Sequence, residues 1–208
     1  MPSLSSQPAQ SRPARRLVLN DFESMAAELK HMRGSCISQA VLGFVRGLRL
    51  SARIIYFLRK YLSDLSLEVD WGHLVDTEEN YLSRECDIII HRAGFYQEWN
   101  DFRNPIMHFK FIKSEKTIAV ISCKSLLVSI DSSYCNFMRT FVEKVFLFAE
   151  CCPPRSITSL KRKAEIAGYA GFGYLYSYDK ATGESQNDPA VWEMFLRKVR
   201  EICEGDAP

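Results

Sequence analysis

Residues 119–125, Ala-Val-Ile-Ser-Cys-Lys-Ser, form a run of small and apolar side chains that ends in a lysine. Such a run, bounded by polar residues, is typical of a buried β-strand. Alternate side chains of a strand share a face, so Val120, Ser122 and Lys124 are expected on the same side of the sheet. The lysine then lies where the strand leaves the core. There it either acts on an anion or only extends its ammonium group to water.

A second strand is predicted at residues 85–91, Glu-Cys-Asp-Ile-Ile-Ile-His, from its β-branched centre and polar flanks. Alternation places Glu85 and Asp87 on one face and the residue that follows each of them on the other. If the two strands are neighbours, Asp87 and Lys124 meet at one end of the sheet. A carboxylate suits Mg²⁺, which prefers oxygen ligands, and a nearby lysine can orient a water or stabilise charge on phosphorus.

These stretches resemble the motifs of the PD-(D/E)XK nuclease superfamily, in a bacterial branch of it. The matching pieces are a helix that contains Gly47, the segment 83–90 (SRECDIII) and the segment 119–124 (AVISCK). The resemblance covers roughly residues 40–150. It implies a restriction-endonuclease-like α/β fold, in which helices flank a mixed central sheet with an αβββαβ core. Extra helices are expected on its N-terminal and C-terminal sides.

The resemblance also implies roles for individual residues. Asp87 matches the metal-binding aspartate, Lys124 matches the catalytic lysine, and Cys123 stands where a backbone carbonyl often joins the metal shell. The implied activity is Mg²⁺-dependent hydrolysis of a nucleic-acid phosphodiester, with DNA as the expected substrate. Proteins that resemble this family often occur in anti-phage or mobile-element settings, so phage defence is the implied context.

Two positions depart from the family pattern. Ser122 stands where the acid before the lysine belongs, and Ser51 stands where a helix glutamate belongs. Opposite unit charges about 4 Å apart are worth roughly 4 kcal/mol at an effective dielectric constant near 20, and about twice that for a divalent ion. Each missing carboxylate therefore weakens a metal site strongly. Glu85 and Glu143 are the acids proposed as substitute metal ligands.

Basic residues recur along the helix predicted at residues 36–62. Arg46, Arg49, Arg53 and Lys60 fall near one face of it, at spacings of three, four and seven residues. This face is either a solvated surface or a track that binds nucleic-acid phosphates.

The overall charge is small, because 27 lysines and arginines face 25 acids, a formal net charge of +2. Strong non-specific binding of nucleic acid is not expected from so small a charge. Residues 63–101 hold ten acids against two arginines, a net of −8. That stretch is either a solvated surface or a site for a cation.

The remaining organisation follows from composition and periodicity. Residues 1–18 are interpreted as a disordered basic leader, and residues 19–208 as a single nuclease-like domain. No apolar run reaches the ~18–20 residues of a membrane span, and seven scattered cysteines without a CxxC pair fit a reducing cytoplasm. Further helices are predicted at residues 20–33, 133–150 and 189–204, and further strands at 66–74, 107–113 and 171–179.

Two functional hypotheses of different classes stay open. The first is a metal-dependent nuclease with an atypical site. The second is a degenerate nuclease-fold module that binds nucleic acid or a protein partner, or forms a homo-oligomer, without cutting. A scaffold whose acidic 63–101 region meets a basic partner is a third. A further carboxylate beside Asp87 that faces Lys124 would favour the first.

Overall fold

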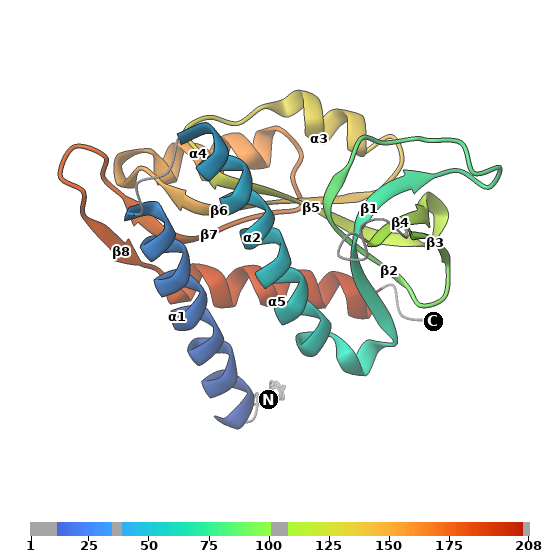
Figure 1. Cartoon of the computed structure of the whole chain (residues 1–208), viewed down its shortest axis with the longest axis horizontal. Helices are drawn as coiled ribbons and strands as arrows, with labels where there is room; N and C mark the ends of the chain where they lie inside the picture. Colours follow the sequence, from blue (N-terminus) through green and yellow to red (C-terminus); the bar gives the residue numbers. More distant parts are fainter. Residues whose placement is uncertain (1–11, 35–38, 101–107, 206–208) are drawn as a thin grey trace, which may run out of the picture.

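The computed structural model describes residues 12–34, 39–100 and 108–205, and Figure 1 shows their arrangement. Within these residues the chain forms five α-helices and eight strands. The helices are α1 (Arg12–Gly34), α2 (Gln39–Tyr61), α3 (Ser132–Met138), α4 (Ile157–Ile166) and α5 (Pro189–Gly205). The strands are β1 (Leu67–Val75), β2 (Cys86–Arg92), β3 (Tyr96–Asn100), β4 (His108–Lys113), β5 (Thr117–Leu126), β6 (Lys144–Cys152), β7 (Gly171–Tyr178) and β8 (Ser185–Asn187).

The eight strands join one sheet in the order β3-β4-β1-β2-β5-β6-β7-β8. β2 runs antiparallel to both β1 and β5, whereas β5, β6 and β7 run parallel to one another. Parallel neighbours need crossover connections, and α3 and α4 lie in these connections. The predicted mixed α/β sheet flanked by helices is confirmed.

Helices cover both faces of the sheet (Figure 1). We call the core under α1, α2 and α5 the α2-side core, and the core under α3 and α4 the α3-side core. Because side chains of β5 alternate, Ile121 and Cys123 enter the α2-side core, while Val120 enters the α3-side core. Both cores are apolar, so the two faces of the central strands are buried.

The helix predicted at residues 133–150 is wrong. α3 ends at Met138, and the chain then forms the strand β6 from Lys144 onward. Every residue of β6 after Lys144 is buried, so polar and apolar side chains do not alternate along it. An apolar run of this kind is typical of a buried helix segment and of a fully buried strand alike. Glu143 therefore lies in the turn before β6 and not on a helix.

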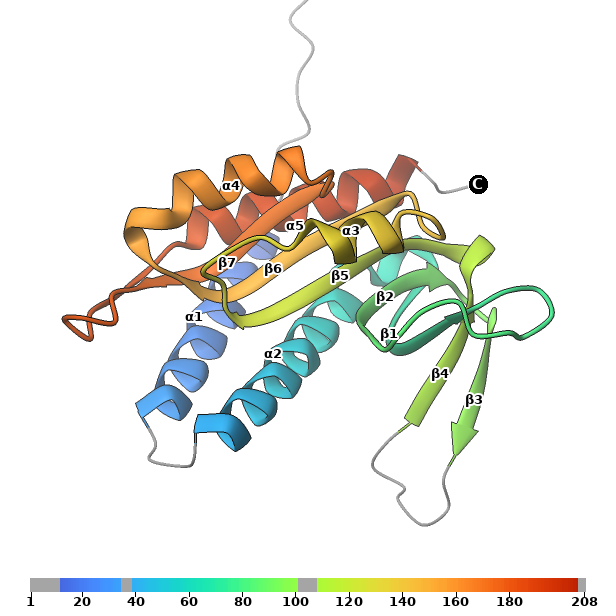
Figure 2. The ribbon, with the colours of Figure 1, turned by 90° about the horizontal axis from the view of Figure 1, so that it is seen from above.

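β3 and β4 form a hairpin that extends away from the rest of the sheet (Figure 2). The strand predicted at residues 107–113 is confirmed as β4, whereas β3, β8 and α4 were not predicted. β4 approaches β1 closely at Gly72, where a Cβ atom would lie 1.9 Å from the carbonyl oxygen of Lys110. Glycine is needed there for this close approach.

The N-terminal helix α1 begins at Arg12, earlier than the predicted start at residue 20. Residues 12–18 of the predicted disordered leader therefore lie in α1, while residues 1–11 lie outside the described residues, so only for these does the leader stay a prediction. None of the described helices is long and apolar enough to cross a membrane.

Candidate active site

Asp87 and Lys124 can meet only if β2 and β5 are neighbouring strands. The pairing of β2 with β5 is confirmed. The strands pair antiparallel, with Ile88 opposite Ile121. One further step in this register brings Asp87 opposite Ser122, and Lys124 follows two residues later on the same face. The two motif strands thus bring their polar residues together at the start of β2 and the end of β5.

Asp87 lies in a β-bulge of β2. Two successive residues of β2, Asp87 and Ile88, face the single residue Trp71 of β1, because the pairing register shifts there. Bulges re-aim side chains and are common beside active sites. As a result Cys86 packs in the α3-side core with Ile89, while Ile88 packs in the α2-side core. The predicted regular alternation across residues 85–88 is therefore wrong.

The Asp87 carboxylate is held at the end of the β2–β5 pair. Its Oδ2 accepts a hydrogen bond from the backbone N–H of Cys123 at 2.8 Å. Burial raises the pKa of Asp87, while this hydrogen bond and the nearby ammonium group of Lys124 oppose the rise. Lys124 itself is exposed. The site therefore combines one desolvated carboxylate with one solvent-accessible ammonium group.

The two acids proposed as substitute ligands lie in different places. Glu85 is exposed just before β2, and its negative charge contributes to the raised pKa of Asp87. Glu143 is exposed and pairs with the lysine that follows it. β6 starts with Lys144 opposite Ala119, so Glu143 lies at the far end of β5, about 20 Å along the strand from Lys124. Of the two, Glu85 is the one whose charge acts on Asp87.

Both serines at the expected acid positions are buried. Ser122 is 1% exposed. Ser51 lies on α2 and its hydroxyl donates a hydrogen bond to the carbonyl of Gly47 at 3.1 Å. Within the described residues, no group of three or more His, Cys, Asp and Glu ligands includes Asp87. The site carries less negative charge than the family pattern requires.

The four basic residues of α2 proposed as a phosphate track all have acid partners inside the fold. These pairs tie α2 to α1 and to β6, and they leave less positive charge for a phosphate. Their role in nucleic-acid binding stays a prediction. The pairs are Arg46–Glu150, Arg49–Glu28, Arg53–Glu28 and Lys60–Asp21, the last with 3.6 Å between Nζ and Oδ2.

Glu150 is a buried charge that was not predicted from the sequence. It is fully buried on β6 and accepts hydrogen bonds from Arg33, Arg46 and Tyr176. The only sequence signal is an acid directly after the apolar run 145–149. Since a buried carboxylate requires such partners, Glu150 fixes α1 and α2 on the sheet.

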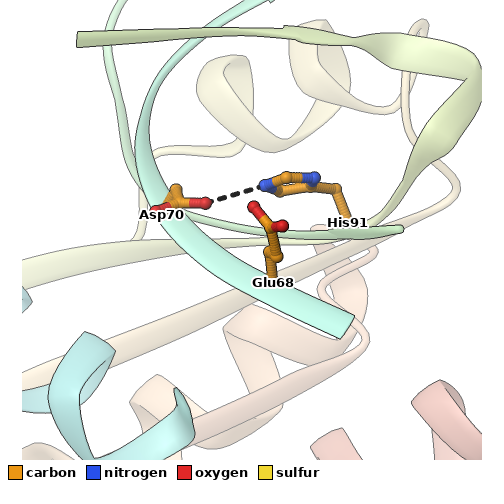
Figure 3. Close-up of side chains that lie close together, drawn as sticks. All are labelled: Glu68, Asp70 and His91. Carbon is orange, nitrogen blue, oxygen red and sulfur yellow. Dashed lines mark hydrogen bonds and ion pairs between the residues drawn. The ribbon is translucent and has the colours of Figure 1, made fainter. Parts of the chain in front are cut away.

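A second group of ionisable side chains lies on β1 and β2. Figure 3 shows Glu68, Asp70 and His91 close together, and their ligand atoms lie within 4.8 Å of one another. His91 Nε2 is 2.9 Å from Asp70 Oδ2. These residues belong to the acidic stretch 63–101, for which a solvated surface and a cation site were the two alternatives, and they are the place in it where a cation could be held.

Protein cations already occupy the surroundings of this second group. Lys110 Nζ of β4 lies 3.0 Å from Asp70 and 3.2 Å from Glu68, and Arg59 of α2 also pairs with Asp70. Burial alone would raise the pKa of Asp70, but the hydrogen bonds from His91 and Lys110 outweigh it and lower the pKa to about 2. The group is an internal ion network whose negative charge the fold itself balances.

Solved structures share this architecture. The chain is similar to NucC of P. aeruginosa ATCC27853 in its cAAA-bound form, with 15% identity, a TM-score of 0.61, and coverage of 96% of this chain and 92% of that chain. It is also similar to cAAA-bound NucC of E. coli MS115-1, with 11% identity, a TM-score of 0.59, and coverage of 96% and 93%. The likeness shows a shared fold. The sequence matches no protein-family model and no curated protein.

Proposed function

We propose that the chain is a NucC-like, nuclease-fold protein of phage defence that acts on nucleic acid in the cytoplasm, with DNA as the expected substrate. The observation that carries this proposal is the position of Asp87 and Lys124 on adjacent antiparallel strands. The fold shared with NucC supports it, since the PD-(D/E)XK site is built on two such strands. The atypical feature is Ser122, which replaces the second acid.

The donor atoms at this end of the sheet fit a weakly held Mg²⁺. Asp87 supplies a carboxylate, and the Cys123 carbonyl is directed toward β2, because the N–H and C=O of a strand residue point to the same side. Mg²⁺ usually keeps several waters and takes one or two carboxylates plus substrate phosphates. The carboxylates of Asp87 and Glu85 and the carbonyl of Cys123 are therefore enough protein ligands for it. When bound, the ion supplies Lewis-acid polarisation of a phosphate oxygen.

Lys124 supplies the positive charge that the protein itself brings to a phosphate. Its exposed ammonium group can pair with a phosphate oxygen or orient the water that attacks phosphorus. Fixed charges in a partly desolvated site stabilise developing negative charge more than bulk water does. Of the four basic residues proposed on α2, Arg49 and Lys60 have the most exposed side chains, 56% and 52%, and we propose these two as contacts for the nucleic-acid backbone.

A second candidate function is a module that binds nucleic acid or a protein partner without cutting. The buried, uncharged Ser122 and Ser51 favour it, since their lost carboxylates would lower the affinity for a divalent ion by orders of magnitude. Such a module would keep Lys124 as a phosphate contact but would not hydrolyse the backbone.

A cleavage assay separates the two candidates. Single- and double-stranded DNA and RNA are incubated with the full chain in Mg²⁺ or Mn²⁺, and with Lys124→Ala as the matched variant. A nuclease gives metal-dependent cutting that falls about 100-fold or more in the variant. Binding that depends on Lys124, without cutting, supports the module. If neither binding nor cutting differs between the two proteins, the nuclease and the module that binds nucleic acid through Lys124 are both wrong.

A further inference from the structure

Among the residues that the structure describes, the buried hydroxyl group of Tyr134 on α3 has no oxygen or nitrogen atom as a hydrogen-bond partner. Burying such a group unpaired costs stability, and native proteins contain few of them. Phenylalanine would fill the same space without this cost. An unpaired buried hydroxyl therefore calls for a partner that binds from outside the chain.

The hydroxyl belongs to the surroundings of the candidate active site. α3 follows β5 directly in the chain, and Lys124 Nζ lies 6.0 Å from the centroid of the Tyr134 ring. Burial, followed by the negative charges that Cys86 and Asp87 can carry, raises the pKa of Tyr134 far above its usual value. The hydroxyl thus keeps its proton at every physiological pH and can act only as a neutral donor or acceptor.

We propose that the Tyr134 hydroxyl and the Lys124 ammonium group form a phosphate-binding subsite at the end of β5. Tyr134 donates a hydrogen bond to a non-bridging oxygen of a nucleic-acid phosphate, and Lys124 pairs with the same phosphate. The subsite rests on the proposed function and names two of its substrate contacts. A preorganised donor in a partly dry site holds a phosphate oxygen well, and it does so without adding a charge beside Asp87.

Two neighbouring groups do not account for the hydroxyl. The Cys86 thiol lies near enough that a hydrogen bond with Tyr134 opposes the rise in its pKa that burial causes, but a thiol is a weak acceptor, and its sulfur already contacts the Ser83 hydroxyl and the Arg84 carbonyl, each at 3.5 Å. The first turn of α3 is capped from within, since the Asp131 carboxylate accepts from the Ser133 N–H at 2.9 Å. The seven-residue helix is thus not itself an anion site.

The test pairs two tyrosine variants that change only a hydroxyl. Tyr134→Phe removes the unpaired group and keeps the ring beside Lys124. Tyr174→Phe is the control. It removes a hydroxyl of β7, also in the α3-side core, that donates a hydrogen bond to Asp188 at 2.6 Å. The affinity of each protein for a fluorescent single-stranded oligonucleotide is measured by anisotropy in Ca²⁺, which limits cutting, and thermal unfolding is recorded in parallel.

We expect Tyr134→Phe to lower the affinity about tenfold, the scale of one hydrogen bond to a charged group, and to raise Tm by about 2–4 °C. Tyr174→Phe should lower Tm and leave the affinity unchanged. If the wild type binds and Tyr134→Phe binds equally well, the subsite is wrong and the proposed function stands. A lower Tm with unchanged affinity gives Tyr134 a structural role instead. A wild type that neither binds nor cuts removes the proposed function and the subsite together.

Discussion

Two carboxylates on the same sheet differ in how completely the protein satisfies them. Asp70 contacts His91, Lys110 and Arg59, and its pKa is lowered to about 2. Asp87 receives one backbone N–H bond and a hydrogen bond from the Ser122 side chain, with an exposed lysine nearby, and its pKa is raised because burial outweighs them. A fully paired carboxylate stabilises the fold, whereas a buried and incompletely paired one costs stability and is typical of functional sites. The difference supports the proposal that Asp70 has a structural role and Asp87 a chemical one.

The largest expected difference between the two carboxylates is in how much each contributes to the free energy of unfolding. Asp70→Ala leaves three cationic or polar partners without their carboxylate, and we expect it to lower the free energy of unfolding by about 3–5 kcal/mol. Asp87→Asn keeps an acceptor for the Cys123 N–H, so we expect a change within about 1 kcal/mol. Urea unfolding of the two variants measures both values. Equal losses would show that the two carboxylates do not differ in role.

The pH dependence of stability sharpens the same contrast. Because the folded pKa of Asp70 is below its unfolded value, its contribution of about 2 kcal/mol is present above pH ~4 and is lost as the pH falls toward about 2. The contribution of Asp87 to the free energy of unfolding has the opposite sign. Its folded pKa is above its unfolded pKa, so Asp87 destabilises the fold increasingly as the pH rises from the unfolded pKa to the folded one.

Thermal unfolding between pH ~2.5 and ~7 separates these two terms. Asp70→Asn should remove much of the acid-induced loss of stability, and Asp87→Asn should remove the penalty at neutral pH. A wild-type acid profile in Asp70→Asn would contradict the pairing described for β1.

A glutamate at position 122 should give Asp87 a second carboxylate beside it, so that the two together hold a cation, as Asp70 and Glu68 hold Lys110. Ser122→Glu places a carboxylate beside Asp87, and we expect Mn²⁺ affinity to rise at least about tenfold. Since Ser122 is 1% exposed, the variant should be less stable without metal and recover when Mn²⁺ is added. Ser159→Glu adds the same charge on the exposed face of α4 and is the control. Unchanged Mn²⁺ affinity in Ser122→Glu would show that position 122 does not face a metal.

The smallest expected effect concerns the basic face of α2. Arg49 pairs with Glu28 at the surface, so Arg49→Ala should cost no more than about 1 kcal/mol of stability. If Arg49 also contacts a phosphate, the dependence of oligonucleotide affinity on salt should weaken by roughly one unit of log–log slope. An unchanged slope would leave Arg49 with a structural role only.

The parts of the fold that could be predicted from the sequence are those set by local patterning. The strands around Asp87 and Lys124 have strong β-branched or apolar cores, and their pairing was expected from the motif resemblance and is observed. β6 could not be distinguished from a helix, because burial on both faces removes the alternation that identifies a strand.

The missed features of the site depend on contacts between distant residues. The bulge at Asp87 arises from the register of β1 against β2, which no short motif encodes. Lys110 meets Asp70 only because β4 packs beside β1, forty residues later in the chain. Tyr134 has no motif of its own, and only the surroundings of its hydroxyl draw attention to it.

Mn²⁺ binding in the presence of a non-cleavable phosphorothioate oligonucleotide tests most directly which carboxylate serves the ligand. We predict that Asp87→Asn abolishes the binding seen by calorimetry, whereas Glu68→Gln, in the internal ion network, leaves it intact. Binding that survives in Asp87→Asn, or that is lost only in Glu68→Gln, would contradict a metal site at the end of β2 and β5.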